Sequence, residues 1–551
     1  MPGRTRADAP YTRLMFEYLP PPQVRAGRRR RHVVAASISV LVVGAIVLAA
    51  TMQPTHVQAA RSDLRIALGA ATSFDPAVQS DSGSAQITAQ LFESLTAVDA
   101  SEQVQPALAA TWETAKDGRE MVFHLRQGLT FSDGSPLTAG DVVASWMRVL
   151  AMAKQGGLAS LLDDVVGAEA YADGSGSASS VGLSAPDSRT IQVDLINPGS
   201  DFAAVASSPT LAVVPPGLKT NPSLLQPGTF VGSGAYVVSA VTATETTLTA
   251  NSHYWAGSPA IATIHITTDI GTQNPVDLFL NGDLDYTWIN SFDATWIAYD
   301  STLGPQLRLS STASVEYYGF DTTKPPFSDV RVRRAFAAGV DWRRLVSLLE
   351  SPTEVSATGM VPPGLPGASS TDFVPQFDLA AAKADLAEAG YPNGVGFPTI
   401  TLVTPGGSVD KAVVAQLRDN LGIDIGYETM DFATYYGRLA SDPPAFWVQD
   451  WQADYPGAND FLGLLLGTGK ANNYGRWSDA DFDAAIEKAL SAGDPASVQA
   501  GFDQAQAVVR DQVPVIPVDN GTSYWLVAKG LLGASTNGQG LIRFAGLAWG
   551  S

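Results

Sequence analysis

The stretch Pro106–Val149, PALAATWETAKDGREMVFHLRQGLTFSDGSPLTAGDVVASWMRV, carries the clearest local structure signals in the chain. The triplet Lys116–Gly118 predicts a tight turn between two runs of strand-forming residues, which indicates a β-hairpin. A second tight turn follows at SDGSP. Thr138 and Asp141 then have the spacing of a capping box, so we expect a helix from there through Leu150.

On the amino-terminal side of this stretch, the pattern predicts a strand and then a helix. LRIAL, Leu64–Leu68, alternates between apolar and other residues as a first strand does. Ser84–Asp99 has apolar residues at helical spacing, through Ile87, Leu91 and Leu95.

On the carboxyl-terminal side, strands and helices alternate. A helix is predicted within Asp378–Gly394, because Gly390 followed by a proline is a stop signal. Strands predicted at Thr399–Pro405 and Ile423–Met430 enclose a helix at Asp410–Leu421. This βαβ alternation predicts an α/β lobe.

The composition favours an acidic, soluble protein of more than one domain. The chain has 551 residues, 45% of them hydrophobic, and a net charge of −20. Residues 1–60 carry eight Arg against Asp8 and Glu17, a charge of +6, so the remainder carries −26. An acidic body repels nucleic acid and anionic lipid, which argues against a nucleic-acid partner.

Cysteine and histidine usage narrows the chemistry further. The chain has no cysteine and five histidines. Disulfides, thiol catalysis, cysteine-based metal sites and lipidation on an N-terminal cysteine are therefore excluded. The histidines show no metal-ligand spacing, so we expect no metal and no cofactor.

The N-terminal 60 residues have the pattern of an export or anchoring segment. Arg28–Arg31 precedes an uncharged apolar run at 33–52, which is long enough to span a bilayer. The arginines should stay cytoplasmic, which places the rest of the chain outside. VQAA, Val57–Ala60, offers small residues for signal peptidase. Cleaved signal peptide and retained anchor both stay open, and the length of the apolar run favours an anchor.

No catalytic motif is recognisable. The sequence lacks a nucleophile elbow, a phosphate-binding glycine loop and a dinucleotide fingerprint, so we expect a protein that is not an enzyme. In FWVQDWQADYPGANDFL, Phe446–Leu462, three aromatic residues lie within nine positions. Trp447, Trp451 and Tyr455 fit either a core or a ligand-binding wall, and the residues alone leave both interpretations open.

A series of motifs resembles the extracytoplasmic oligopeptide- and dipeptide-binding proteins of bacterial ABC importers, the large solute-binding family 5. The motifs follow the order of that family over almost all of Leu64–Val527. They are LFESLTAVD, the opening stretch, GSGAYVV, NSHYWAG, LNGDLDY, KPPFSDVRVRRAFAAGVD, LAEAGYP and WQADYP.

The resemblance implies an α/β fold of the periplasmic-binding-protein-like type II, or Venus flytrap, class. The chain would form two α/β lobes and, in addition, an extra small domain. Lobe I would comprise 61–103, 216–305 and 520–551; the extra domain, 104–215; and lobe III, 306–519. The two crossovers between lobes, near 305 and 520, would serve as the hinge.

The resemblance also implies the ligand-binding residues. In peptide-binding members the Asp of the W-x-x-D-Y motif, here Asp454, pairs with the ligand's α-ammonium, a charge-assisted hydrogen bond. Two extended segments, matching Ser80–Ser82 and Asp450–Gln452, would pair with the peptide backbone by strand addition. The expected ligand-binding set is Ser80, Asp81, Ser82, Phe432, Asp450, Trp451, Gln452, Asp454 and Tyr455.

Two positions depart from the family pattern. Some peptide binders carry an Arg three residues before the motif Trp to hold a ligand carboxylate, and here that position is Val448. Asp450 stands where a small residue is common and adds negative charge beside the site. Val448 leaves open how a ligand carboxylate would be bound. The negative charge of Asp450 favours basic or amine-bearing ligands.

The expected function is the extracytoplasmic binding component of an ABC importer, located in the periplasm or at the cell surface. It would capture peptides between the lobes and deliver them to the membrane permease, as a monomer. The alternatives are the same role for a nickel chelate, an oligosaccharide or an opine, a cleft hydrolase, and a membrane-tethered sensor. Turnover would reveal the hydrolase, and the lack of a dedicated permease would reveal the sensor.

Overall fold

The computed structural model describes residues 61–550 except 70, 80, 116–117, 156–157, 200, 220 and 350–354. The basic tail and the apolar segment predicted within residues 1–60 lie outside the described residues. Among the helices that are described, none has both the length and the apolar character needed to cross a membrane.

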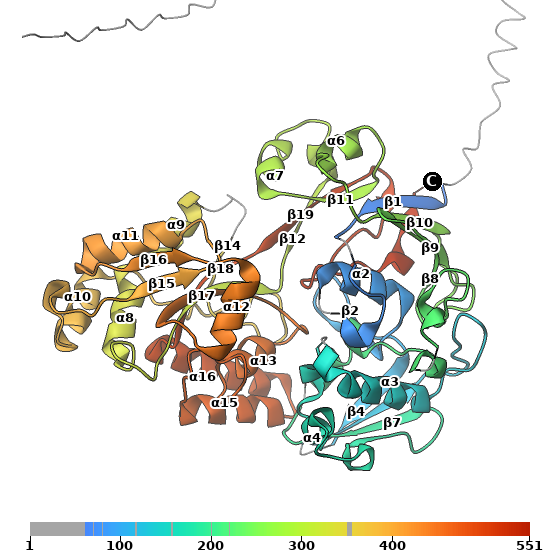
Figure 1. Ribbon diagram of the computed structural model, residues 1–551, viewed down its shortest axis with the longest axis horizontal. Coiled ribbons are helices and arrows are strands. Elements are labelled where there is room, and N and C mark those ends of the chain that lie inside the picture. The colour runs from blue at the N-terminus through green and yellow to red at the C-terminus, as the bar shows by residue number, and fades with distance from the viewer. Residues whose placement is uncertain are drawn as a thin grey trace, which may run out of the picture. The chain divides into compact units, whose positions relative to one another are not determined.

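The first sheet has seven strands in the order β12-β19-β11-β1-β10-β9-β8 (Figure 1). β1 is an inner strand and runs parallel to both neighbours, with Leu64 opposite Ile264 and Ile66 opposite Tyr286. The predicted first strand is confirmed. The strands are β1 (Asp63–Ala67), β8 (Tyr236–Val241), β9 (Glu245–Ala250), β10 (Thr263–Thr267), β11 (Tyr286–Ile289), β12 (Leu307–Ser311) and β19 (Thr522–Val527). We refer to this sheet, together with α2 (Ser82–Leu91), α6 (Pro275–Leu280) and α7 (Ser291–Ile297), as lobe I.

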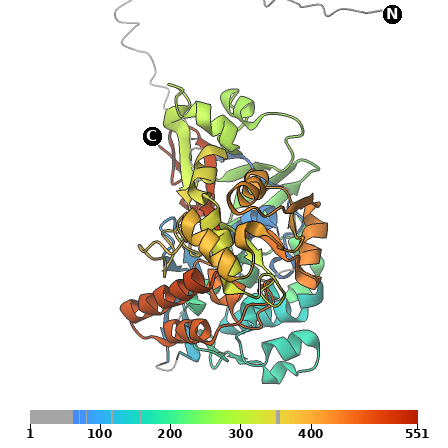
Figure 2. The same cartoon turned by 90° about the vertical axis from the view of Figure 1, so that its left-hand side faces the viewer.

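The second sheet has six strands in the order β14-β18-β13-β17-β15-β16, and we refer to it and its helices as lobe III. Its strands are β13 (Ser314–Phe320), β14 (Val355–Ser356), β15 (Thr401–Thr404), β16 (Gly426–Thr429), β17 (Phe446–Gln452) and β18 (Val515–Asn520). Its helices are α8 (Val330–Gly339), α9 (Trp342–Leu349), α10 (Leu379–Glu388), α11 (Asp410–Leu421), α12 (Phe432–Ser441), α13 (Ala458–Phe461), α14 (Gly463–Leu466), α15 (Ala480–Ser491) and α16 (Pro495–Gln512). The predicted β15-α11-β16 alternation is confirmed, with β15 and β16 parallel. Figures 1 and 2 show α15 and α16 side by side.

β17 separates two cores of lobe III, because successive side chains of a strand point to opposite faces. Phe446 and Val448 pack into one core, where the ring of Phe446 stacks 5.3 Å from that of Phe320. Trp447 packs into the other core, with its ring 5.8 Å from that of Tyr317. Trp447 is therefore a core residue.

The extra domain is built on a four-stranded antiparallel sheet, β4-β5-β7-β6. The predicted capping box is present: the Thr138 backbone N–H donates to the Asp141 carboxylate at 2.8 Å, and the helix extends to Ala151. The elements are β4 (Ala109–Thr114), β5 (Glu120–Leu125), β6 (Leu183–Ser184), β7 (Thr190–Asp194), α3 (Ala139–Ala151), α4 (Ala168–Asp173) and α5 (Phe202–Val205). Two two-stranded antiparallel sheets complete the described strands, β2 (Thr96–Val98) with β3 (Val104–Pro106) and β20 (Leu531–Leu532) with β21 (Ala548–Trp549).

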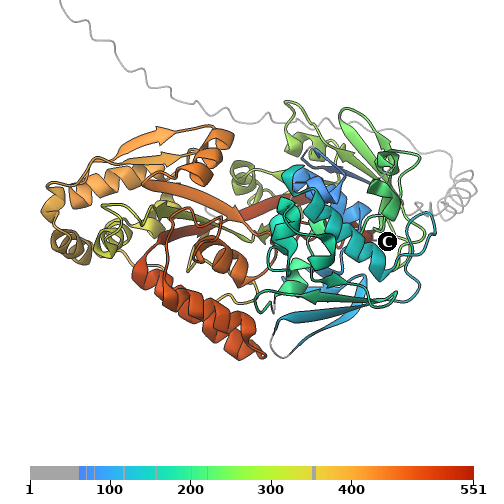
Figure 3. The same ribbon diagram turned by 60° about the horizontal axis from the view of Figure 1, so that its bottom comes forward.

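Two adjacent segments connect lobe I to lobe III. β12 leads into β13 through Thr312, and β18 leads into β19 through Gly521; Figures 1 and 3 show β19 running between the two sheets. The Thr312 N–H donates to the Gly521 carbonyl at 2.9 Å. The first of these segments leaves the first sheet after Ser311, because Leu307–Ser311 pairs with β19.

Candidate functional site

Half of β17 has an open edge. On one side the strand pairs with β13 along its whole length, but on the other it pairs with β15 only at Phe446 and Trp447. The Ala453 N–H donates to the Ala313 carbonyl, so the alternation directs the backbone groups of Val448, Asp450 and Gln452 away from β13. Backbone donors and acceptors are therefore available beside Asp450 and Gln452.

Two tyrosines of α12 reach this open edge. The Tyr435 hydroxyl donates to the Val448 carbonyl at 2.5 Å and accepts from the Val448 N–H at 3.1 Å. The Tyr436 hydroxyl lies 3.5 Å from the Asp450 carbonyl. The Tyr435 hydroxyl thus satisfies both backbone groups of Val448, whereas the Asp450 carbonyl has only the long contact with Tyr436 on this edge.

Phe432 extends the same aromatic surface. It is the first residue of α12, its side chain is 70% exposed, and its ring lies 4.5 Å from that of Tyr436. Phe432 contacts Tyr436, whose hydroxyl reaches the open edge of β17. The two rings together could form an aromatic wall beside that edge.

A sharp corner follows β17 and holds the motif Asp. The Asp454 backbone N–H and the Trp451 indole N–H both donate to Oδ2 of Asp460, at 3.3 and 2.8 Å. From lobe I, the Gln539 side chain donates to the carbonyls of Asp454 and Ala453, at 2.9 and 3.3 Å. The corner is thus held from both lobes.

The carboxyl of Asp454 has no counter-charge among the residues that the structure describes. Among the ion pairs and hydrogen bonds of the described residues, none involves the Asp454 side chain, and burial raises its pKa to about 6. Desolvation disfavours the ionised form of a carboxyl that lacks a cation. A positive ligand group would remove that cost.

Further carboxyls surround the corner. Burial, and then the charge of Asp454, raise the pKa of Asp460 well above its usual range. Desolvation also raises the pKa values of Asp201 and Asp450. Asp201 accepts a hydrogen bond from the Tyr455 hydroxyl at 2.8 Å, and Asp450 keeps contact with solvent. A positively charged ligand group at the corner would favour the ionised form of these carboxyls.

The other predicted residues differ in placement. Gln452 donates from its side chain to the Gly538 carbonyl at 3.0 Å, and Tyr455 is buried in the core of the extra domain. Asp81 caps α2 by accepting the Ser84 N–H at 2.7 Å. Burial is the largest single influence on the pKa of Asp81 and raises it, but the hydrogen bonds from Thr72 and Ser84 together outweigh burial, so the pKa is lowered.

The prediction that Ser80–Ser82 is an extended segment was wrong at Ser82, which is the first residue of α2. Asp81 has extended backbone, and Ser80 lies outside the described residues. The cause is local: the side chain of Asp81 caps the helix at this point, so the chain turns helical earlier than the predicted start at Ser84. None of the hydrogen bonds found between described residues joins Asp81 or Ser82 to 450–455.

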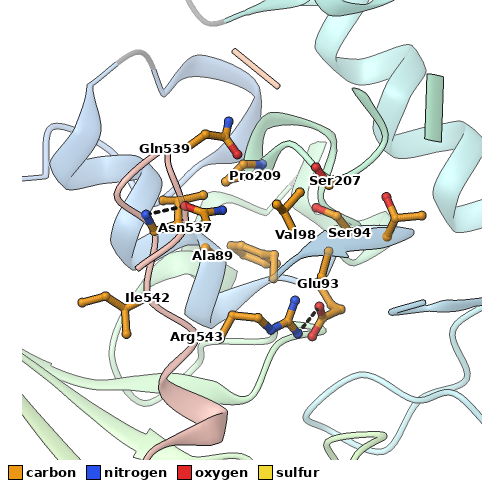
Figure 4. A pocket seen from close by; sticks show the side chains of 14 residues that line it. Ala89, Glu93, Ser94, Val98, Ser207, Pro209, Asn537, Gln539, Ile542 and Arg543 are labelled. Carbon is orange, nitrogen blue, oxygen red and sulfur yellow. Dashed lines mark hydrogen bonds and ion pairs between the residues drawn. The ribbon is translucent and has the colours of Figure 1, made fainter. Parts of the chain in front are cut away.

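The carboxyl-terminal segment 537–543 connects α2 to the corner. Gln90 donates to the Ile542 carbonyl at 2.8 Å, three residues from Gln539. With Glu93 and Ser94, this segment lines a cavity of about 40 Å³, across which Arg543 pairs with Glu93 at 2.7 Å (Figure 4). That volume suits a few water molecules, so this cavity is not a peptide site.

Sequence reasoning missed Asp460, Gln539, Tyr435 and Tyr436. Asp460 lies in the quoted motif, and its position six residues after Asp454 was the one available signal. Gln539 had no signal, since it lies 85 residues from Asp454. Across the described ranges, His, Asp and Glu form no group of three that is placed to hold a metal ion.

The sequence and the fold match those of known proteins. A family model described as bacterial extracellular solute-binding proteins, family 5 Middle, matches residues 103–473. The chain is 31% identical over 459 residues to the probable deoxycholate-binding periplasmic protein YgiS of Escherichia coli, covering 81% of this chain and 85% of that protein. It is 25% identical over 462 residues to the dipeptide-binding protein DppE of Bacillus subtilis, covering 81% and 84%.

Solved structures match over most of the chain. The unliganded open form of the periplasmic murein tripeptide-binding protein MppA gives a TM-score of 0.77 at 23% identity, covering 89% of this chain and 97% of that one. The HbpA2 protein of Haemophilus parasuis gives 0.75 at 24% identity, covering 89% and 100%. At these identities the likeness concerns the fold, and the predicted periplasmic-binding-protein-like fold is confirmed.

Proposed function

The chain belongs to the bacterial extracellular solute-binding proteins of family 5, and we propose that it captures peptides at the open edge of β17. In this proposal the ligand's α-ammonium pairs with Asp454, and the loaded protein delivers the peptide to the permease of an ABC importer.

The observation that carries this proposal is the Asp454 carboxyl, which burial desolvates and which no described cation neutralises. An α-ammonium brings one positive charge and three N–H donors, and a charge-assisted bond of this kind contributes roughly 1.5–3 kcal/mol. A carboxylate in this state favours a cationic ligand over a neutral one of the same shape.

The geometry beside Asp454 suits an extended chain. The open edge at Asp450 and Gln452 offers backbone groups two residues apart, which is the repeat of a strand. Main-chain pairing holds peptides of any sequence, while the ammonium contact fixes their register. Relatives described as dipeptide-binding and murein tripeptide-binding proteins support this ligand class.

The similarity to a probable deoxycholate-binding protein raises a second candidate. Deoxycholate carries a carboxylate and no positive charge. The carboxylates of Asp450 and Asp454 would repel it, and no Arg or Lys is bonded to either of them in the described residues. The local charge therefore favours the peptide.

Anchoring is a separate part of the proposal. The apolar run at 33–52 is long enough to hold the extracytoplasmic body to the membrane. The N-terminal residue of the mature protein, read by Edman sequencing of the membrane fraction, tests this. A mature chain beginning near residue 61 would show a cleaved signal peptide instead.

Two measurements on the full-length protein test the peptide assignment. Mass spectrometry of molecules that co-purify with it should identify peptides with free amino termini. Calorimetric titration should show binding of tri-alanine and no binding of deoxycholate. Binding of deoxycholate with no response to tri-alanine would overturn the assignment.

A further inference from the structure

Asp460, in the short helix α13, is a buried carboxyl with one unpartnered oxygen. Its side chain is 0% exposed. Oδ2 accepts both N–H groups of the corner, from Trp451 and Asp454. Oδ1 has no hydrogen-bond partner among the described residues. An unsatisfied buried oxygen of this kind is costly, so it calls for an explanation.

The groups that face Asp460 supply no positive charge. The ionisable groups that act on it are the carboxyls of Asp454 and Asp201, and Tyr455 is the neighbouring phenol. Described Lys and Arg side chains form no ion pair with any of these carboxyls. Burial and the neighbouring carboxyls therefore favour the protonated form of Asp460, and its proton would lie on Oδ1 because both N–H donors occupy Oδ2.

The same geometry suits the ionised form once a cation is present. The Trp451 and Asp454 N–H groups already point at Oδ2, and hydrogen bonds from N–H donors stabilise a carboxylate. An ammonium placed at Asp454 would offset the repulsion between the two carboxyls. Asp460 is thus arranged to ionise when a positive ligand arrives.

We propose that Asp460 gives up its proton when the ligand's ammonium enters, so that capture exchanges one proton for one positive charge at the Asp454–Asp460 pair. The step balances: the neutral carboxyl and the ammonium yield a carboxylate paired with the ammonium, and the proton leaves to solvent. This inference rests on the proposed peptide-binding function and extends it to a second carboxyl.

Asp460 holds the backbone N–H of Asp454 and the indole N–H of Trp451 in place, so it is a positioning residue. In the proposal it also releases a proton to solvent. The substitution Asp460→Asn separates its roles, because the amide oxygen can still accept both N–H groups while the amide carries no charge and no titrating proton. Asp419→Asn, on the exposed face of α11, is the matched control.

The test is calorimetric titration of the full-length protein with tri-alanine at pH 7, in buffers of differing ionisation enthalpy, which counts the protons released. We expect close to one proton for the native protein and for Asp419→Asn. We expect none for Asp460→Asn, with an affinity at least tenfold lower. The affinity of the native protein should rise about tenfold per pH unit near neutrality, the linkage expected for one released proton.

The outcomes distinguish this inference from the function beneath it. Binding of tri-alanine with no proton release, or full affinity in Asp460→Asn, overturns the inference and leaves peptide binding intact. If Asp460→Asn fails to fold, the proton count and pH profile of the native protein decide alone. Absence of any peptide binding overturns the proposed function itself.

Discussion

The hydroxyl of Tyr455 donates a hydrogen bond to the carboxyl of Asp201, 2.8 Å away and 254 positions earlier in the sequence. The ring of Tyr455 packs in the core of the extra domain. The residue after Asp454 therefore ties the corner of lobe III to the extra domain, and Asn459 donates to the same hydroxyl at 3.1 Å.

The first prediction concerns this tie. Tyr455→Phe keeps the ring but leaves Asp201 and Asn459 without their shared partner, so we expect a loss of about 1–3 kcal/mol in the free energy of unfolding. Urea unfolding followed by tryptophan fluorescence measures it. Tyr299→Phe, at a position 90% exposed, should change stability little and serves as control. Equal stability of both variants would show that the Tyr455 bond contributes nothing.

The second prediction concerns the motif carboxyl. Asp454→Ala should weaken tri-alanine binding at least tenfold, because it removes the partner of the ammonium, and should leave the circular dichroism spectrum unchanged. Asp424→Ala, an exposed Asp in the same lobe, should bind like the native protein. Unchanged affinity in Asp454→Ala would place the anchor elsewhere.

The third prediction concerns pH and stability. Burial raises the pKa of Asp454 to about 6, above that of an unfolded Asp near 4. Between these values the folded state holds more protons than the unfolded state, so stability falls as pH rises through this window. Without ligand, the protein should be more stable to urea at pH 5 than at pH 7.5, by about 1.4 kcal/mol from this group.

Asp163 also contributes to the pH dependence of stability, because burial raises its pKa to about 6. The variant Asp454→Asn separates the contribution of Asp454 from that of Asp163. Its stability should change less between pH 5 and pH 7.5 than that of the native protein. An identical pH dependence in both proteins would mean that Asp454 titrates normally.

The fourth prediction concerns the open edge of β17. Asp450→Pro removes a backbone N–H that faces away from β13, a place where an edge strand tolerates proline. We expect peptide affinity to fall about five- to tenfold, the value of one lost hydrogen bond of 1–1.4 kcal/mol. Asp450→Ala keeps the N–H and should fall less. If the two variants bind equally, the ligand does not pair with this N–H.

Local signals allowed much of the fold to be predicted from the sequence. The capping box at Thr138, the stop at Gly390 and the limits of α11 all depend on neighbouring residues, and the structure contains each of them. The start of α2 was predicted two residues late, because the capping role of Asp81 was overlooked.

The site was less accessible to sequence reasoning. The resemblance drew attention to Asp454, but a carboxyl's burial and its missing counter-charge are properties of the assembled lobes. Gln539 and Asp201 meet the corner only because two lobes and the extra domain converge there. Asp460 lies close in sequence, yet its unpartnered oxygen depends on where Trp451 and Asp454 direct their N–H groups.

The central claim is that an α-ammonium is the part of the ligand that Asp454 recognises. Its most direct test is calorimetric titration of the full-length protein with tri-alanine and with N-acetyl-tri-alanine at pH 7.5. We predict measurable binding of the free peptide and at least tenfold weaker binding of the acetylated one, which lacks the charge. Equal affinity for the two peptides would contradict the account.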